Sequence, residues 1–264
     1  MLPPANQGRK ALQDYERYLA TAPRGAYAND AKGRWTALRS NPNQTQKILT
    51  AADQSKLNEA GSLYDQAIKL QQANKLDEAL DMYKKAIAAQ PNEASYYYGI
   101  GTCYMAKNDL GQAVANFKKA ISLNPQEPSF KQALKQANQA QAAPLIESAI
   151  KKQTVANSAG KYDLPGAIAD YEAALKIDDD ANTYLNLGTA YQANNNLPRA
   201  AEEYKRALQM SPSLADAHYY LGTIYDTNGQ KFPAISEYQK YLRAVPNGTN
   251  AADARNRLKL LLGR

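Results

Sequence analysis

The sequence contains one cysteine and one histidine among its 264 residues, so most catalytic and metal-binding sites lack the side chains they need. A single cysteine excludes an internal disulfide. Cys103 and His218 lie far apart in the sequence, which argues against a Cys–His nucleophile pair or a zinc site. We therefore expect no enzyme activity, no metal and no cofactor, and we expect both side chains to serve in packing.

Long apolar runs and dense basic blocks are also absent. No stretch approaches the roughly 20 apolar residues that span a bilayer, so we expect no direct membrane insertion. The net charge is +7, but the 32 basic and 25 acidic residues are spread along the chain, and we expect no nucleic-acid partner. The first residues lack the apolar core of a signal peptide, which leaves a cytoplasmic or a periplasmic location open.

The stretch 181–212 carries the pattern around which the chain is organised. Gly188 and Tyr191 lie on one face of a first predicted helix, and Ala200 and Tyr204 lie on one face of a second. The run Asn-Asn-Asn-Leu-Pro between them suits a turn, because asparagine tolerates the left-handed conformation that ends a helix and proline suits the next first turn. The stretch therefore predicts two short helices that approach closely at small residues.

The same landmarks recur along the chain. The alanine of the second helix recurs at a nearly constant interval, broken by one longer gap between the second and third members, as Ala79, Ala113, Ala167, Ala200 and Ala234. The aromatic residue of the second helix recurs as Tyr83, Phe117, Tyr171, Tyr204 and Tyr238. The small residue of the first helix recurs as Ala67, Gly101, Gly188 and Gly222, with Val155 standing in its place in the third unit. Positive φ is expected at the turn position, which holds Asn74, Asn108, Asn195 and Gly229.

With a spacing of about 34 residues, these landmarks resemble the tetratricopeptide repeat (TPR) over most of residues 54–262. The resemblance implies an all-α fold, a right-handed α-solenoid of helix–turn–helix repeats with capping helices. It also implies that the first helices line an inner groove that binds a peptide or a partner protein.

The repeat phase divides the chain into three expected parts. A half repeat and a degenerate repeat occupy 1–53, two repeats and an extra helix occupy 54–143, and three repeats with a capping helix occupy 145–264. The extra helix, 128–143, is expected to end at Pro144, because proline interrupts a helix. A joint between two packed blocks is therefore predicted there.

Residues 10–35 match residues 233–258 at one constant offset, with Tyr18 aligned to Tyr241. The match looks like the back half of a repeat whose first helix would precede Met1. We expect the chain to be a fragment of a longer protein. The alternative is a half repeat that another chain completes.

Carried over position by position, the resemblance implies a groove stripe that is nearly uncharged. The predicted peptide-binding residues are Tyr64, Ile68, Tyr98, Thr102, Met105, Lys152, Asn182, Leu185, Asn186, Thr189, Gln192, Tyr219, Tyr220 and Thr223. Uncharged amides bond an extended backbone, and tyrosine rings contact its side chains. The alternative is that such residues are merely tolerated on helix faces. Removing the Tyr98 and Tyr219 rings is expected to weaken partner binding without lowering the melting temperature.

The sequence thus favours a non-catalytic protein–protein interaction scaffold. Two alternatives stay open, a self-assembling homo-oligomer and an accessory TPR region of a larger, enzymatic polypeptide. Lys152 and Asn186 fall near positions of the carboxylate clamp with which TPR proteins hold chaperone C-termini. The rest of that set is absent, so an acidic chaperone terminus is not expected as the ligand.

Overall fold

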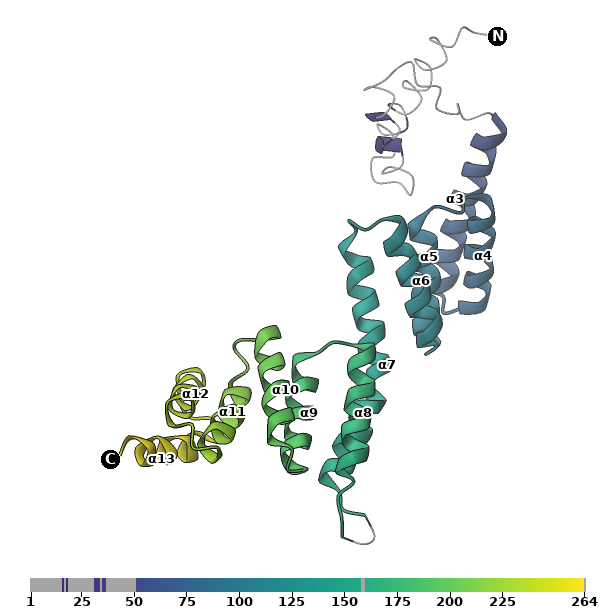
Figure 1. Ribbon diagram of the computed structural model, residues 1–264. Helices are drawn as coiled ribbons and strands as arrows, with labels where there is room; N and C mark the ends of the chain where they lie inside the picture. The colour runs from purple at the N-terminus through teal and green to yellow at the C-terminus, as the bar shows by residue number, and fades with distance from the viewer. Residues whose placement is uncertain are drawn as a thin grey trace. The chain divides into compact units, whose positions relative to one another are not determined.

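All regular structure in the part of the chain that the computed structural model describes is α-helical (Figure 1). The structure describes residues 16, 18, 31–33, 35–36, 51–157 and 160–263. The helices with defined bounds are α3 (Ala51–Gln72), α4 (Leu76–Ala89), α5 (Ala94–Ala106), α6 (Leu110–Leu123), α7 (Pro128–Thr154), α8 (Leu164–Ile177), α9 (Ala181–Ala193), α10 (Leu197–Met210), α11 (Ala215–Thr227), α12 (Lys231–Ala244) and α13 (Ala251–Leu262). The half repeat and degenerate repeat predicted for 1–53 lie almost entirely outside the described residues.

Contacts between Cα atoms divide the chain into two compact units, unit 1 over Met1–Leu134 and unit 2 over Lys135–Arg264. In unit 1, α3 packs on α4 and α5 packs on α6. In unit 2, α9 packs on α10 and α11 packs on α12, and the first helices α9 and α11 also contact each other. Each unit is therefore built from helix pairs, as predicted. The division at residues 143–145 stays a prediction.

Small residues in the first helices allow the aromatic side chains of the second helices to pack against the backbone. A Cβ atom on Gly188 would lie 2.5 Å from Cε1 of Tyr204, and one on Gly101 would lie 2.5 Å from Cε1 of Phe117. Both rings are fully buried. The side chain missing at the glycine thus makes room for a large apolar group that holds the pair together.

The turns within the helix pairs have the predicted backbone conformation. The φ angle is 58° at Asn74, 60° at Asn108, 58° at Asn195 and 69° at Gly229. Asparagine and glycine are the residues that adopt this left-handed region at least cost. The predicted register is therefore confirmed for these four turns.

Helix α7 does not end at Pro144, so that expectation was wrong. The helix continues to Thr154 with the proline inside it. The interval from Gly101 to Ala149, the small residue of the next first helix, exceeds one repeat period by about four helical turns. Because the excess is close to a whole number of turns, the packed face of α7 stays on the same side before and after the proline. A proline in a helix costs about 3 kcal/mol through the lost hydrogen bond and the clash, and buried residues on both sides, such as Ala142 and Ala149, compensate for that cost.

The predicted register of the third repeat was also wrong, because the loop between its two helices is longer than expected. Nine residues, 155–163, separate α7 from α8, whereas three separate the two helices of the other pairs. Val155 is 57% exposed, and the fully buried Ala149 occupies the small-residue position instead. The longer loop is closed by hydrogen bonds from Asn157 N to Lys161 O (2.8 Å) and from Gly160 N to Asn157 O (2.8 Å). Counting back by a fixed period from the second helix ignores such an insertion, so every predicted position in the first helix was placed too late in the sequence.

Candidate functional site

The predicted groove residues lie at five equivalent positions of each first helix, which we call the first-helix row. In unit 1 the row consists of Gly61, Tyr64, Asp65, Ile68 and Gln71 in α3 and of Ser95, Tyr98, Gly99, Thr102 and Met105 in α5. In unit 2 it consists of Ala143, Ile146, Glu147, Ile150 and Gln153 in α7, of Asn182, Leu185, Asn186, Thr189 and Gln192 in α9, and of Asp216, Tyr219, Tyr220, Thr223 and Asp226 in α11. Every predicted site residue except Lys152 belongs to it. The corrected register adds Glu147, Ile150 and Gln153, which the sequence reasoning missed.

Lys152 lies outside the row, at the position that Tyr191 occupies in the next repeat. Its Nζ atom lies 2.6 Å from Oδ2 of Asp170 in α8, and Ser148 Oγ donates to the same oxygen at 2.6 Å. The hydrogen bond from Lys152, together with that from Ser148, lowers the pKa of the Asp170 carboxyl. Lys152 therefore joins two helices of one repeat.

In unit 1 the side chains of Gln71 and Thr102 in the row are hydrogen-bonded within the protein itself. Tyr83 in α4 donates its hydroxyl to Gln71 Oε1 at 2.8 Å, and Gln71 Nε2 donates to Thr102 Oγ1 at 3.0 Å. Thr102 Oγ1 in turn donates to the Gly99 carbonyl at 2.8 Å. We call this chain of three bonds the Tyr–Gln–Thr relay. It ties a second helix to its own first helix and to the first helix of the next repeat.

The same relay is present once in unit 2. Tyr171 in α8 donates to Gln153 Oε1 at 3.1 Å, Gln153 Nε2 donates to Thr189 Oγ1 at 3.0 Å, and Thr189 donates to the Asn186 carbonyl at 2.7 Å. Burial raises the pKa of Tyr171 to about 12. Thr189, a predicted groove residue, is thus bonded on both sides within the protein.

Between α9 and α11 the relay stays incomplete. Tyr204 donates to Gln192 Oε1 at 2.8 Å, and Thr223 donates to the Tyr220 carbonyl at 2.7 Å. Gln192 Nε2, however, donates to no other described residue, so the link between the two repeats is missing. The Tyr220 ring lies here instead, stacked on Tyr204 with ring centroids 5.5 Å apart and planes at 17°.

Three further polar groups of the row around this gap form no hydrogen bond with a described residue. They are the side-chain amides of Asn182 and Asn186 and the hydroxyl of Tyr220. Asn182 is exposed, and Asn186 and Tyr220 are half-buried. Burial and then the nearby Asp216 carboxylate raise the pKa of Tyr220, so its hydroxyl stays protonated and able to donate. The α9–α11 part of the row therefore presents unoccupied donors and acceptors.

The rings of Tyr64, Tyr98 and Tyr219 belong to the packed interior as much as to the row. Tyr98 lies 5.0 Å from Phe130 and 5.7 Å from Phe117 between ring centroids, and Tyr64 lies 5.2 Å from Tyr96. Tyr219 contacts the rings of Tyr220, Tyr238 and Tyr241. The expectation that Tyr98 and Tyr219 are dispensable for stability does not agree with this packing.

Tyr219 and α11 are also fixed to the last helix. The Tyr219 hydroxyl donates to Asp253 Oδ2 in α13 at 2.8 Å, and burial, followed by this bond, raises the pKa of Tyr219 to about 12. Arg257 in α13 donates to Asp253 Oδ2 at 2.7 Å and to Asp226 Oδ2 at 3.0 Å. The carboxylate at the end of the row, Asp226, is thus neutralised by an arginine of the capping helix.

Residues with catalytic potential are held in packing contacts. Cys103 is fully buried, and burial raises the pKa of its thiol to about 11, so it is a poor nucleophile. His218 Nδ1 lies 2.5 Å from Oε2 of the buried Glu237 in α12. Across the described residues, no group of three or more His, Cys, Asp and Glu side chains is arranged to hold a metal. None of the described helices has both the length and the apolar character needed to cross a bilayer.

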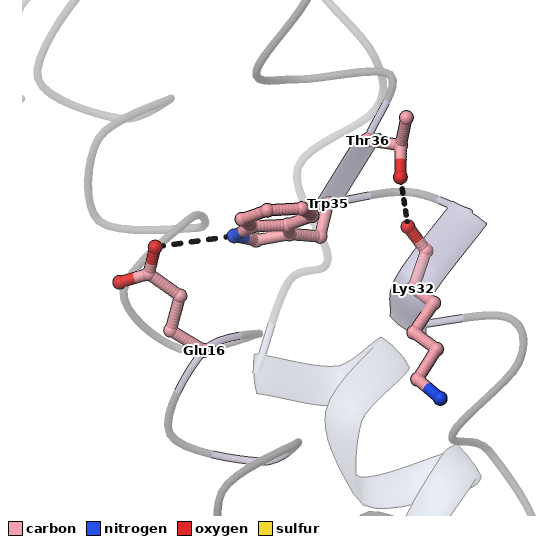
Figure 2. Close-up of a pocket in the computed structure, with 4 residues that line it drawn as sticks. All are labelled: Glu16, Lys32, Trp35 and Thr36. Carbon is pink, nitrogen blue, oxygen red and sulfur yellow. Dashed lines mark hydrogen bonds between the residues drawn. The ribbon is translucent and has the colours of Figure 1, made fainter.

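A hollow of about 450 Å³ lies near the start of the chain, lined by Glu16, Lys32, Trp35 and Thr36 (Figure 2). Trp35 Nε1 donates to Glu16 Oε1 at 3.1 Å, and Thr36 Oγ1 donates to the Lys32 carbonyl at 2.8 Å. Most residues in this part of the chain fall outside those that the structure describes. We therefore assign no function to the hollow.

Comparison with known proteins gives one matching family. The family model described as the tetratricopeptide repeat matches residues 49–128 and 185–249, more than half of the chain. No curated protein matches the sequence significantly.

Several solved structures are similar at low identity. YrrB, described as a TPR protein with an unusual peptide-binding site, aligns over 84% of this chain and 96% of its own at 19% identity, with a TM-score of 0.35. TTC0263, a thermophilic TPR protein in Thermus thermophilus, aligns over 78% of this chain and 100% of its own at 19% identity, with a TM-score of 0.35. The first TPR of Spaghetti (RPAP3), bound to the HSP90 peptide SRMEEVD, aligns over 47% of this chain and 94% of its own at 18% identity, with a TM-score of 0.41.

Proposed function

The chain belongs to the tetratricopeptide-repeat family, and from that premise we propose that it is a non-catalytic interaction scaffold that holds an extended segment of a protein partner on its first-helix row. The site of binding in this proposal is the part of the row in α9 and α11. Its partner is a peptide or protein, and neither a nucleic acid nor a cofactor has a role in it.

The observation that carries the proposal is the set of unbonded polar groups beside the incomplete relay. Polar groups without a bond inside the protein are free to bond a ligand, and each such hydrogen bond contributes about 0.5–1.5 kcal/mol. The Asn186 and Gln192 amides suit the backbone of an extended peptide, because an amide both donates and accepts. The Tyr220 ring beside them offers apolar contact with little conformational entropy to lose.

The Asn182 and Asn186 side chains allow a direct test, because neither supports the fold through a hydrogen bond to a described residue. The full chain is used to select binders from a phage-displayed library of random dodecapeptides. The selected peptides should bind the double variant Asn182→Ala, Asn186→Ala about 10-fold more weakly than the unsubstituted chain, since each lost hydrogen bond is worth about 0.5–1.5 kcal/mol. Thermal unfolding should show the same melting temperature for both.

A matched control is Gln239→Ala, which removes an exposed amide from the second helix α12 of the same unit. It should leave the affinities of the selected peptides unchanged. If no peptide is enriched, or if enriched peptides bind the asparagine variant as tightly as the unsubstituted chain, the proposed function is wrong.

A second candidate function is self-association through the end of unit 2. Phe232 in α12 is 82% exposed and Leu260 in α13 is 80% exposed, and contact with a second copy would remove these apolar side chains from water. Sedimentation over a concentration range tests this candidate. Self-association requires a mass that rises with concentration and that falls when both residues are replaced by serine, whereas a monomer at all concentrations rules it out.

A further inference from the structure

The row in unit 2 has a charge pattern that differs from the chain as a whole. No row position in α7, α9 or α11 holds lysine or arginine, whereas three hold carboxylates, at Glu147, Asp216 and Asp226. Asp226 is neutralised by Arg257. Glu147 and Asp216 are exposed, and neither forms an ion pair with a described residue.

The second helices α8, α10 and α12 of unit 2 carry both signs of charge, with seven cations and five carboxylates, whereas the row has no cation. Helix α8 carries Lys176, helix α10 carries Arg199, Lys205 and Arg206, and helix α12 carries Lys231, Lys240 and Arg243. These positions are exposed and lie outside the row. The net charge of +7 therefore describes the chain as a whole, and the row has the opposite sign.

The aromatic groups of the row also suit a cation. The Tyr220 ring is half-buried and stacked on Tyr204, and a lysine or arginine placed within about 6 Å of such a ring is attracted by its π face. The same helices already hold cations in this way: Lys205 Nζ lies 5.8 Å from the Tyr225 ring, and Arg206 Cζ lies 5.9 Å from the Tyr184 ring.

From this charge pattern we propose that the segment held on the row of unit 2 is cationic, with lysine or arginine side chains that meet Glu147, Asp216 and the face of Tyr220. The inference rests on the proposed function and adds the class of partner to it. Asn182 and Asn186 lie between the two carboxylates along the row, so the backbone of the segment bonds the amides while its basic side chains reach to either side. An acidic segment finds no cation on the row.

The positive net charge of the chain opposes such a ligand only at long range. Salt screens charges separated by more than about 8 Å at physiological ionic strength, so the nearest groups decide the sign of the interaction. Exposed ion pairs are weak individually, at about 0.2–1 kcal/mol each. The charge preference is therefore expected as a selectivity of several fold and not as the main source of affinity.

The test selects peptides from the random dodecapeptide library with the unsubstituted full chain. It then measures their affinity for three forms: the unsubstituted chain, the double variant Glu147→Gln, Asp216→Asn, and the control Glu202→Gln. Glu202 is an exposed carboxylate on the second helix α10. Peptides selected by the unsubstituted chain should contain more Lys and Arg than Asp and Glu. Their affinity for the double variant should fall about 3- to 10-fold at physiological salt, and this difference should shrink at about 1 M NaCl. The Glu202→Gln control should bind them as the unsubstituted chain does.

Selected peptides without an excess of basic residues, or with an excess of acidic ones, overturn the inference. A loss of affinity in Glu202→Gln as large as in the double variant overturns it too, because bulk charge would then explain the preference. Either result leaves the proposed function intact if the selected peptides still lose affinity for the asparagine variant. If no selected peptide depends on Asn182 and Asn186, the proposed function fails and this inference fails with it.

Discussion

Gln71 in unit 1 and Gln192 in unit 2 occupy the same repeat position but do different things. Gln71 bonds both Tyr83 of its own repeat and Thr102 of the next, whereas Gln192 bonds Tyr204 alone. Both ends of the Gln71 amide, its oxygen and its nitrogen, therefore take part in holding two repeats together. The NH₂ group of Gln192 has no partner among the described residues and can donate to a ligand.

The residue that makes this difference is the neighbour in the next first helix. Gly99 lies against Tyr83, and a Cβ there would collide with the ring, whereas Asn186 holds the same row position next to the complete relay of Tyr171. The equivalent position in α11 holds Tyr220, whose ring stacks on Tyr204. The same repeat pattern thus produces a closed seam between α3 and α5 and between α7 and α9, and a seam with open polar groups between α9 and α11.

The largest expected effect is a difference in unfolding free energy between variants of the packed rings of the row and variants of its open amides. Tyr219→Ala should lower the free energy of unfolding by about 3 kcal/mol, because the ring contacts three other tyrosines and truncation of a packed aromatic side chain leaves a cavity. Asn182→Ala should change it by less than about 0.5 kcal/mol, as is usual for exposed sites. Urea unfolding of both variants measures the contrast. Equal losses would show that the row is one structural layer without an open part.

A smaller effect on the free energy of unfolding is expected when Tyr83 and Gln71 of the closed relay are replaced by the apolar pair found in the repeat of α5 and α6. There Phe117 and Met105 stand at the positions of Tyr83 and Gln71. Tyr83→Phe or Gln71→Met alone should each cost about 1–2 kcal/mol, because the first leaves the half-buried Gln71 amide and the second the buried Tyr83 hydroxyl without its partner. The double variant should cost less than the two single ones together, since it removes both partners.

A double-mutant cycle by urea unfolding gives the coupling of Tyr83 and Gln71. The corresponding cycle at Tyr204 and Gln192 serves as the comparison. Gln192→Met should lower the free energy of unfolding by less than Gln71→Met does, because Gln192 makes one hydrogen bond fewer. Additive losses at Tyr83 and Gln71 would contradict the relay.

The smallest effect concerns alkaline pH. Burial raises the pKa of Tyr171 to about 12, above the value of about 10 for an unfolded tyrosine. Between these values the unfolded chain ionises while the folded one stays protonated, so the stability contributed by Tyr171 is fully present below about pH 9 and is lost as pH rises towards 12. At about pH 10.5 the loss is about 1 kcal/mol or less. Tyr171→Phe should therefore flatten the fall of unfolding free energy between about pH 9 and pH 11, and an unchanged slope would contradict the assignment.

The repeat pairs and their turns were predictable because each local signal had one physical meaning. Asparagine at a fixed place between two amphipathic helices indicated positive φ. A small residue in the first helix, together with an aromatic residue in the second, indicated close packing of the two helices. The pairing of the helices and the positive φ of the four turns followed from these signals. No long-range information was needed for them.

The third repeat was mispredicted because two insertions hid inside the single long interval between Ala113 and Ala167. One insertion lengthens α7 through Pro144, and the other lengthens the loop before α8. The hydrogen-bonded pairs Gln71–Tyr83 and Gln192–Tyr204 share one sequence spacing. A search for other Gln and Tyr residues on facing helices could have identified Gln153 as the partner of Tyr171.

Two further features could not be read from the sequence. The continuity of α7 through Pro144 depends on what the flanking turns bury, which a local pattern does not show. Which amides of the row stay open was also hidden, because it depends on contacts between repeats.

Side-chain amide NMR signals test the central claim most directly, that the open seam in unit 2 holds the partner. The NH₂ signals of Asn186 and Gln192 should shift when a selected peptide is added to the full chain, while those of Gln71, already bonded to Thr102, should stay in place. Signals of Gln71 that shift as much as those of Gln192, or an Asn186 amide that does not respond, would contradict the account.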